Sequence, residues 1–259
     1  MTGTGAALSD RDPTAAPTLR DASKVAGWGL VFWGAAQLAV AVFARNEMAL
    51  LAVQAALAEW GAGRMGIAWS DPLASTASWK QLGGRAGKGV ALGAAAATAI
   101  VVVAVATAGA TCTVRSPAVG LLAVGLVGAL LQAVRDELLL RGVVLRVTRG
   151  LLPSWGTLLA CGGAAAAARF GVDGALGIGL AVEALRGAVL GAIWTRDRGA
   201  WMAVGANAAW AWTLGSIVRG GVLDVRFATE PDAGIPALAV LLAATVAAHW
   251  ATRRRTARP

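Results

Sequence analysis

The stretch GVALGAAAATAIVVVAVATAGA, residues 89–110, contains no charged side chain over 22 positions. An uncharged apolar run of about 18 residues or more is typical of a helix that crosses a membrane. The whole chain agrees, because 57% of its 259 residues are hydrophobic and only 14% are charged, against about 25% charged in soluble domains. A soluble protein of this size cannot bury so much apolar surface. We therefore exclude a soluble enzyme, a disordered chain and a disulfide scaffold.

Further apolar segments flank this stretch on both sides. Residues 48–62 are the weakest of them, since they are short and contain Gln54 and Glu59, and residues 174–194 carry Glu183 and Arg186. The remaining segments are residues 25–44, 118–134, 151–168, 200–218 and 234–250. Together they predict an all-α fold, a polytopic transmembrane helical bundle of about eight membrane segments.

The distribution of basic residues predicts the orientation of this bundle. With eight spans, 17 of the Lys and Arg residues fall on one side and five on the other, with Arg186 inside a span. Since positive loops stay in the cytoplasm, we expect both termini there and the protein in the plasma membrane. The predicted parts are a polar tail (residues 1–24), a transmembrane domain (25–250) and a basic tail (251–259). The net charge of +9 is then a feature of topology, and the expected partner is the lipid bilayer, not nucleic acid.

Ionisable residues within or beside apolar segments are the candidates for function, because they are costly in a membrane. The run DELLLRG, residues 136–142, contains two adjacent carboxylates and an arginine. If the helix continues, Glu137 and Arg141 face each other at i, i+4. Asp136 and Glu137 could then activate a water molecule; otherwise the run is a charge cluster that ends a helix.

Two other places carry polar groups inside apolar segments. Glu183 and Arg186, at i, i+3, form an ion pair that stabilises a bundle or lines a pathway. Asn207 lies in AVGANAAWAW, residues 203–212, where an amide most often bonds to a neighbouring helix. Cys112 and Cys161 have no metal-ligand spacing, and a single histidine, His249, cannot build a histidine-rich metal site.

The order of these features resembles the CPBP family of intramembrane proteases, which includes the CAAX prenyl endopeptidases and bacteriocin-processing or immunity proteins. The resemblance rests on DELLLRG and, further on, RGAVLGAIWTRDRGAWMAVGANAAWAWTLG (residues 186–215), and covers a core of residues 118–250. It implies a catalytic set of Asp136, Glu137 and Arg141, with Arg169 and Asn207 at the positions of the family's histidines.

The chain departs from the family pattern at several of these positions. The first Glu of Glu-Glu-x-x-x-Arg is Asp136, and Phe-x-x-x-His becomes Ala165 and Arg169. The motif His-x-x-x-Asn becomes Asn207 and Ala211. The family implies zinc, but its histidine ligands are missing, so we expect no cofactor and no metal. We expect Arg169 to form a salt bridge to the acidic pair in place of a metal, although the topology puts Arg169 near the outer surface.

Three functions are consistent with these features. The first is a pseudoenzyme of the CPBP type that binds a peptide or a lipidated protein segment with weakened or lost catalysis. The second is an active glutamate-dependent intramembrane endopeptidase, a hydrolase. The third is an unrelated transporter or membrane scaffold. The two family functions require Asp136, Glu137, Arg169 and Asn207 to meet in one cavity, whereas a transporter requires Glu183 and Arg186 to face a pore.

Overall fold

The structure is a computed structural model, and it describes residues 18–70, 78–108, 111–114, 116, 118–173, 177–218, 222–226 and 234–244. The predicted basic tail, residues 251–259, and His249 lie outside the described residues, as does most of the predicted N-terminal tail. The first helix begins at Leu19, ahead of the predicted start at residue 25, with the Thr18 hydroxyl accepting a hydrogen bond from the Asp21 amide.

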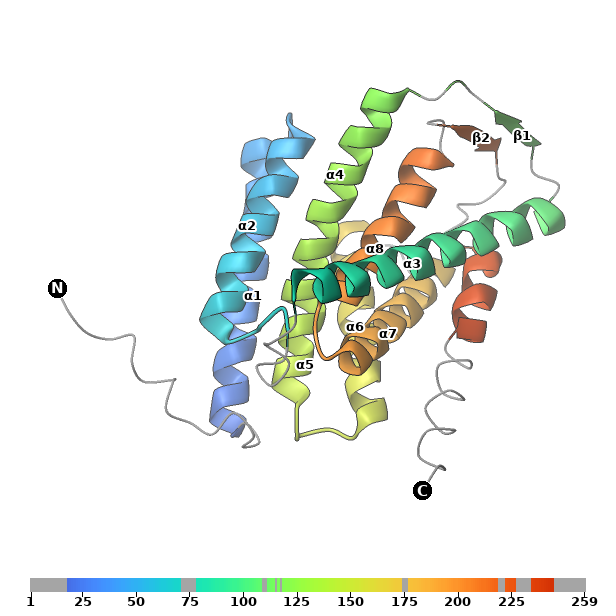
Figure 1. The fold of residues 1–259 in the computed structure, drawn as a ribbon. Coiled ribbons are helices and arrows are strands. Elements are labelled where there is room, and N and C mark those ends of the chain that lie inside the picture. Colours follow the sequence, from blue (N-terminus) through green and yellow to red (C-terminus); the bar gives the residue numbers. More distant parts are fainter. Residues whose placement is uncertain are drawn as a thin grey trace.

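Long helices make up most of the described chain (Figure 1). The α-helices are α1 (Leu19–Phe43), α2 (Glu47–Met65), α3 (Trp79–Ala108), α4 (Val119–Asp136), α5 (Val143–Thr148), α6 (Ser154–Asp173), α7 (Ile178–Asp197) and α8 (Trp201–Trp212). Helices α1, α2 and the helix that begins with α4 run roughly side by side, and α3 crosses them (Figure 1). Two π-helical segments, η2 (Glu137–Gly142) and η3 (Thr213–Ile217), continue α4 and α8. A short apolar helix, Ile235–Ala244, follows. The expected helical fold is therefore present.

The helix that carries DELLLRG does not end at residue 134, where the charges predict its end. Helix α4, η2 and α5 form one continuous rod over Val119–Thr148. The rod continues because its charged side chains are paired with other groups of the bundle, as described below. The charge cluster therefore lies within a helix, and the interpretation that it only ends one is wrong.

Among the described residues, four helices are long and apolar enough to cross a membrane: Leu19–Phe43, Trp79–Thr107, Val119–Thr148 and Ile178–Asp197. The prediction of about eight spans is not supported by the described residues. Helix α2 contains Gln54, Glu59 and Arg64, and α8 has only 12 residues before the π-helical segment begins. Helix α6 consists largely of alanine and glycine, which contribute less hydrophobic free energy than larger residues.

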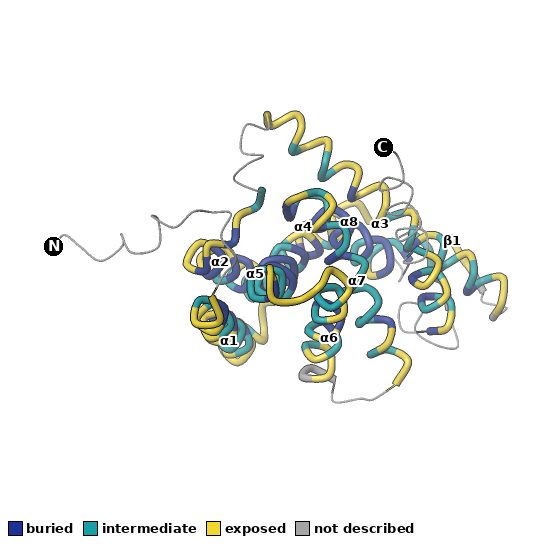
Figure 2. The backbone as a smooth tube through the Cα atoms, turned by 90° about the horizontal axis from the view of Figure 1, so that it is seen from below, coloured by how far each residue is buried: buried dark blue, intermediate teal, exposed yellow. Residues whose placement is uncertain are grey.

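Close contact between α3 and α8 positions the helix that carries Asn207. A Cβ atom at Gly89 or Gly93 would collide with the backbone of Met202 or Ala206. Small residues let helix backbones approach in this way, as is common in membrane bundles. Seen from below, α8 lies between α3 and the α4 rod (Figure 2), and it is buried over most of its length. The face of α8 that bears Asn207 is thus held in the centre of the bundle.

A small antiparallel sheet lies beyond the ends of α3 and η3, where an all-α fold predicts no strand. Strand β1 (Thr111–Val114) pairs with β2 (Leu223–Arg226), with Thr111 opposite Arg226 and Val114 opposite Leu223 (Figure 1). The strands join the end of α3 to the segment after η3. Threonine and valine favour this extended conformation, but the pairing is between residues far apart in the chain.

Candidate functional site

A buried polar cluster forms where the α4 rod meets α8. The Glu137 carboxylate lies 2.9 Å from Arg141, measured from Oε1 to Nη1, and the Asn207 amide donates a hydrogen bond of 3.0 Å to the same oxygen. The side chains of Glu137 and Arg141 are 0% and 1% exposed. The π-helical segment η2 brings Glu137 and Arg141 together, because residues at i and i+4 lie on adjoining faces of a helix. Single π-helical turns are frequent at functional sites. Three of the predicted site residues therefore meet at one point.

Asp136 belongs to a different set of contacts, although it is adjacent to Glu137 in the chain. Arg135 contacts Asp136 Oδ1 at 2.7 Å through Nη2 and at 2.8 Å through Nε. Its Nη1 donates to Gln54 Oε1 at 2.7 Å, and Gln54 donates to the Ala36 carbonyl at 2.8 Å. This chain of bonds ties the rod to α2 and α1. The two carboxylates have different partners, so they do not form the pair that would activate one water molecule together.

Arg169 lies on α6 and is exposed. In the described part of the chain, the cations in contact with Asp136 and Glu137 are Arg135 and Arg141. The structure therefore brings Glu137, Arg141 and Asn207 together, pairs Asp136 with Arg135, and leaves Arg169 outside this cluster.

The second ion pair predicted from the sequence lies on the neighbouring helix α7. Arg186 Nη2 is 2.9 Å from Glu183 Oε2, and both side chains retain some exposure, 17% and 15%. Arg186 is close enough to Glu137 to interact electrostatically with its carboxylate. The two polar groups are thus neighbours within the bundle, and the described residues give no contact that makes Glu183 and Arg186 the lining of a continuous pore.

Several polar atoms in this region are buried without a hydrogen-bond partner among the described residues. They are Glu137 Oε2, Arg141 Nε and Nη1, Arg186 Nε and Trp210 Nε1. Arg141 Nη1 is at ion-pair distance from Glu137, but its N–H is not aligned with the oxygen as a hydrogen bond requires. Buried polar atoms without a hydrogen-bond partner are rare in proteins. These atoms could therefore still form hydrogen bonds at this site.

Three residues near these ion pairs were not among the predicted site residues. Arg135 directly follows the predicted segment 118–134 and so falls outside the predicted helix. Gln54 only weakens the prediction of a span over residues 48–62. Cys161 is buried on α6 and lies near Arg141 and Glu137. Only the position of Arg135 next to Asp136 could have signalled its role, since the other contacts are long-range.

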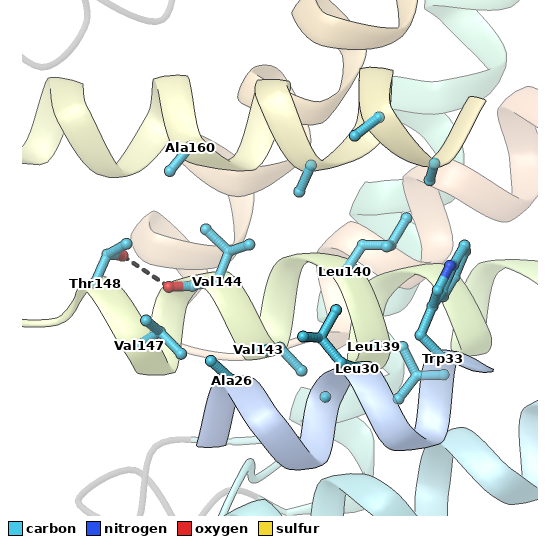
Figure 3. Close-up of a pocket in the computed structure, with 14 residues that line it drawn as sticks. Ala26, Leu30, Trp33, Leu139, Leu140, Val143, Val144, Val147, Thr148 and Ala160 are labelled. Carbon is cyan, nitrogen blue, oxygen red and sulfur yellow. Dashed lines mark hydrogen bonds between the residues drawn. The ribbon is translucent and has the colours of Figure 1, made fainter. Parts of the chain in front are cut away.

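An apolar groove lies beside the same helical segment. Leu139 and Leu140 of η2 line it (Figure 3), whereas Glu137 of η2 contacts Asn207 of α8. The groove has a volume of about 420 Å³ and lies between α1, the η2–α5 part of the rod and α6. One short segment of the rod therefore takes part in both a buried ion pair and an open apolar surface.

The described residues contain no group of three or more His, Cys, Asp or Glu side chains placed to hold a metal ion. Around Glu137 the available donors are a carboxylate and an amide, with a guanidinium directly beside them. Comparison of the chain with protein-family models, with curated proteins and with solved structures found no match.

Proposed function

We propose that the chain is a membrane protein of the CPBP type, a pseudoenzyme in which the acidic site has become a structural ion pair. It binds a peptide or a lipidated protein segment and does not hydrolyse it. The observation that carries this proposal is the hydrogen bond from Asn207 to Glu137. The order of motifs alone aligned these two residues with one site, although 70 positions separate them in the chain.

The surroundings of Glu137 support the loss of catalysis. A general base must reach a water molecule and carry its proton, but this carboxylate is 0% exposed and one of its oxygens already contacts Arg141 and Asn207. Asp136, the other acid of the motif, is bound to Arg135. We therefore assign Glu137 and Arg141 to structure and not to water activation.

The zinc that the family resemblance implies does not fit these residues. Zinc in proteins is held by three or four imidazole, thiolate or carboxylate ligands, and Glu137 and Asn207 supply one carboxylate and one neutral amide. The adjacent Arg141 guanidinium repels a second cation. We propose that the site works without a metal, in a protein whose two ends face the cytoplasm.

A cleavage and binding assay tests this proposal. The purified full-length chain, reconstituted in vesicles, is given prenylated and unmodified membrane peptides, alongside Glu137→Ala and the matched control Glu183→Ala. We expect saturable binding of a peptide and no turnover by any of the three proteins. Turnover that Glu137→Ala abolishes and Glu183→Ala retains would establish the active endopeptidase instead. Absence of both binding and turnover would overturn the proposed function.

A further inference from the structure

The groove between α1, the rod and α6 is suited to a hydrocarbon chain. Its single hydroxyl, that of Thr148, already donates to the Val144 carbonyl at 2.8 Å (Figure 3). The lining residues are otherwise apolar apart from the indole N–H of Trp33. They are Ala26, Gly29, Leu30, Trp33, Leu139, Leu140, Val143, Val144, Val147, Thr148, Ala160, Ala164, Ala167 and Ala168. A volume of about 420 Å³ is in the range of sites that hold small organic ligands.

The length of the groove matches one leaflet of a membrane. It follows the rod from Leu139 to Thr148, which at a rise of 1.5 Å per residue is about 14 Å. The hydrocarbon core of a bilayer is about 30 Å thick, so the groove extends over about half of it. The occupant that this length fits is a single acyl chain of one leaflet.

The walls leave the groove open toward the lipid. Helix α6 contributes only alanines to the groove: Ala160, Ala164, Ala167 and Ala168. This spacing places them on one face of the helix, and their small side chains leave room opposite the rod. On α1, Leu30 is 73% exposed and forms the outer rim. Helices α1 and α6 each contact α5 from different sides (Figure 2). A lipid can therefore enter sideways from the bilayer.

Basic residues follow the end of the groove at which Ala26 and Thr148 lie. Arg20 and Lys24 precede Ala26 on α1, and Arg149 follows Thr148 directly, while Asp21 offsets part of this charge. By the positive-inside rule this end faces the cytoplasm, where anionic lipids are concentrated and attract basic residues near the surface. We infer that the groove holds one acyl chain of an anionic glycerophospholipid, with the headgroup at this basic end.

This inference goes beyond the proposed function and does not depend on Glu137. Trp33 lines the groove, so its fluorescence reports the occupant. The full-length chain is reconstituted in phosphatidylcholine vesicles that contain a minor fraction of either brominated phosphatidylglycerol or brominated phosphatidylcholine, since bromine on an acyl chain quenches nearby indoles. The difference between the native chain and Trp33→Phe isolates the signal of Trp33 from the other tryptophans.

We expect the Trp33 signal to be quenched at lower concentrations of phosphatidylglycerol than of phosphatidylcholine. Neutralising Lys24 and Arg149 to Gln should reduce this preference by about fivefold per charge. Ala164→Phe fills the groove and should abolish quenching by both lipids, and Ala167→Phe, at an exposed position, repeats the test if the first variant folds poorly. Equal quenching by both lipids, or quenching that survives both Phe variants in folded protein, would overturn the inference. Displacement of the quencher by a prenylated peptide but not by phosphatidylglycerol would also overturn it.

Discussion

The ion pair between Glu137 and Arg141 gives the sharpest prediction about stability. At 2.9 Å and an effective dielectric constant of about 20, the attraction between the two charges is about 6 kcal/mol. Removing both ions from water costs several kcal/mol each. The pair as a whole therefore contributes little net stability relative to neutral side chains of similar size.

Breaking the pair on one side has a much larger effect. Arg141→Met leaves the Glu137 carboxylate buried without its cation, and we expect a loss of about 3–5 kcal/mol in the free energy of unfolding. Glu137→Gln alone should cost a similar amount, because the guanidinium is then uncompensated. The double variant, Glu137→Gln with Arg141→Met, should lose far less stability than the two single variants added together. It leaves no unpaired charge, and Gln still accepts the hydrogen bond from Asn207.

The measurement is equilibrium unfolding in detergent micelles, titrated with sodium dodecyl sulfate and followed by helical circular dichroism. Arg85→Met is the matched control, because Arg85 Nε lies 3.6 Å from Asp197 Oδ1 and the arginine side chain is 28% exposed. Its loss should cost about 1 kcal/mol or less. A loss for Arg141→Met no larger than that of this control would contradict the cost of an unpaired buried charge. A double variant as unstable as the two single changes added together would contradict it as well.

Three further predictions concern the packing around the site and the burial of the two cysteines. Asn207→Leu should cost about 1.5–3 kcal/mol by removing a hydrogen bond to a buried charged group, and a change within the error of the unfolding titration would contradict this. Gly93→Ala should destabilise the chain by about 1–3 kcal/mol, because the new Cβ meets the Ala206 backbone. Gly87→Ala on the same helix meets nothing within 4 Å and should be neutral or stabilising by up to about 1 kcal/mol; equal effects would refute the close contact of α3 with α8. Of the two cysteines, exposed Cys112 should react with a maleimide in the folded protein and buried Cys161 only after unfolding, as mass spectrometry of the labelled chain would show.

The sequence predicted the helical, apolar character of the fold because the hydrophobic runs are long and uninterrupted. The predicted helix ends were wrong where charged and polar residues pair with one another inside the bundle. Arg135 and Asp136 neutralise each other within one helix, and Gln54 bonds to a carbonyl on α1, so a charged stretch did not end a helix. Conversely, α8 reads as a long apolar run but has a π-helical segment after Trp212.

The sequence predicts only those contacts of the site that lie within one helix. The spacing of Glu137 and Arg141 is local, and helix geometry fixes it. The contact with Asn207 is long-range and became visible only through the order of motifs in a resemblance. The separation of Asp136 from Glu137 could not be predicted, because it depends on which helices pack against the two adjoining faces of the rod. The same applies to the strand pair β1–β2.

Glu137, Arg141 and Asn207 form a site sealed from water, and the reactivity of a cysteine at position 207 tests this most directly. Folded Asn207→Cys is exposed to a small maleimide in vesicles, with Cys112 as the internal reactive control. Exposed Cys112 should be labelled in the folded protein, and position 207 should react only after unfolding. Rapid labelling at position 207 in the folded protein would show that water reaches the site, and this would contradict a structural ion pair in favour of a hydrolase or a transport pathway.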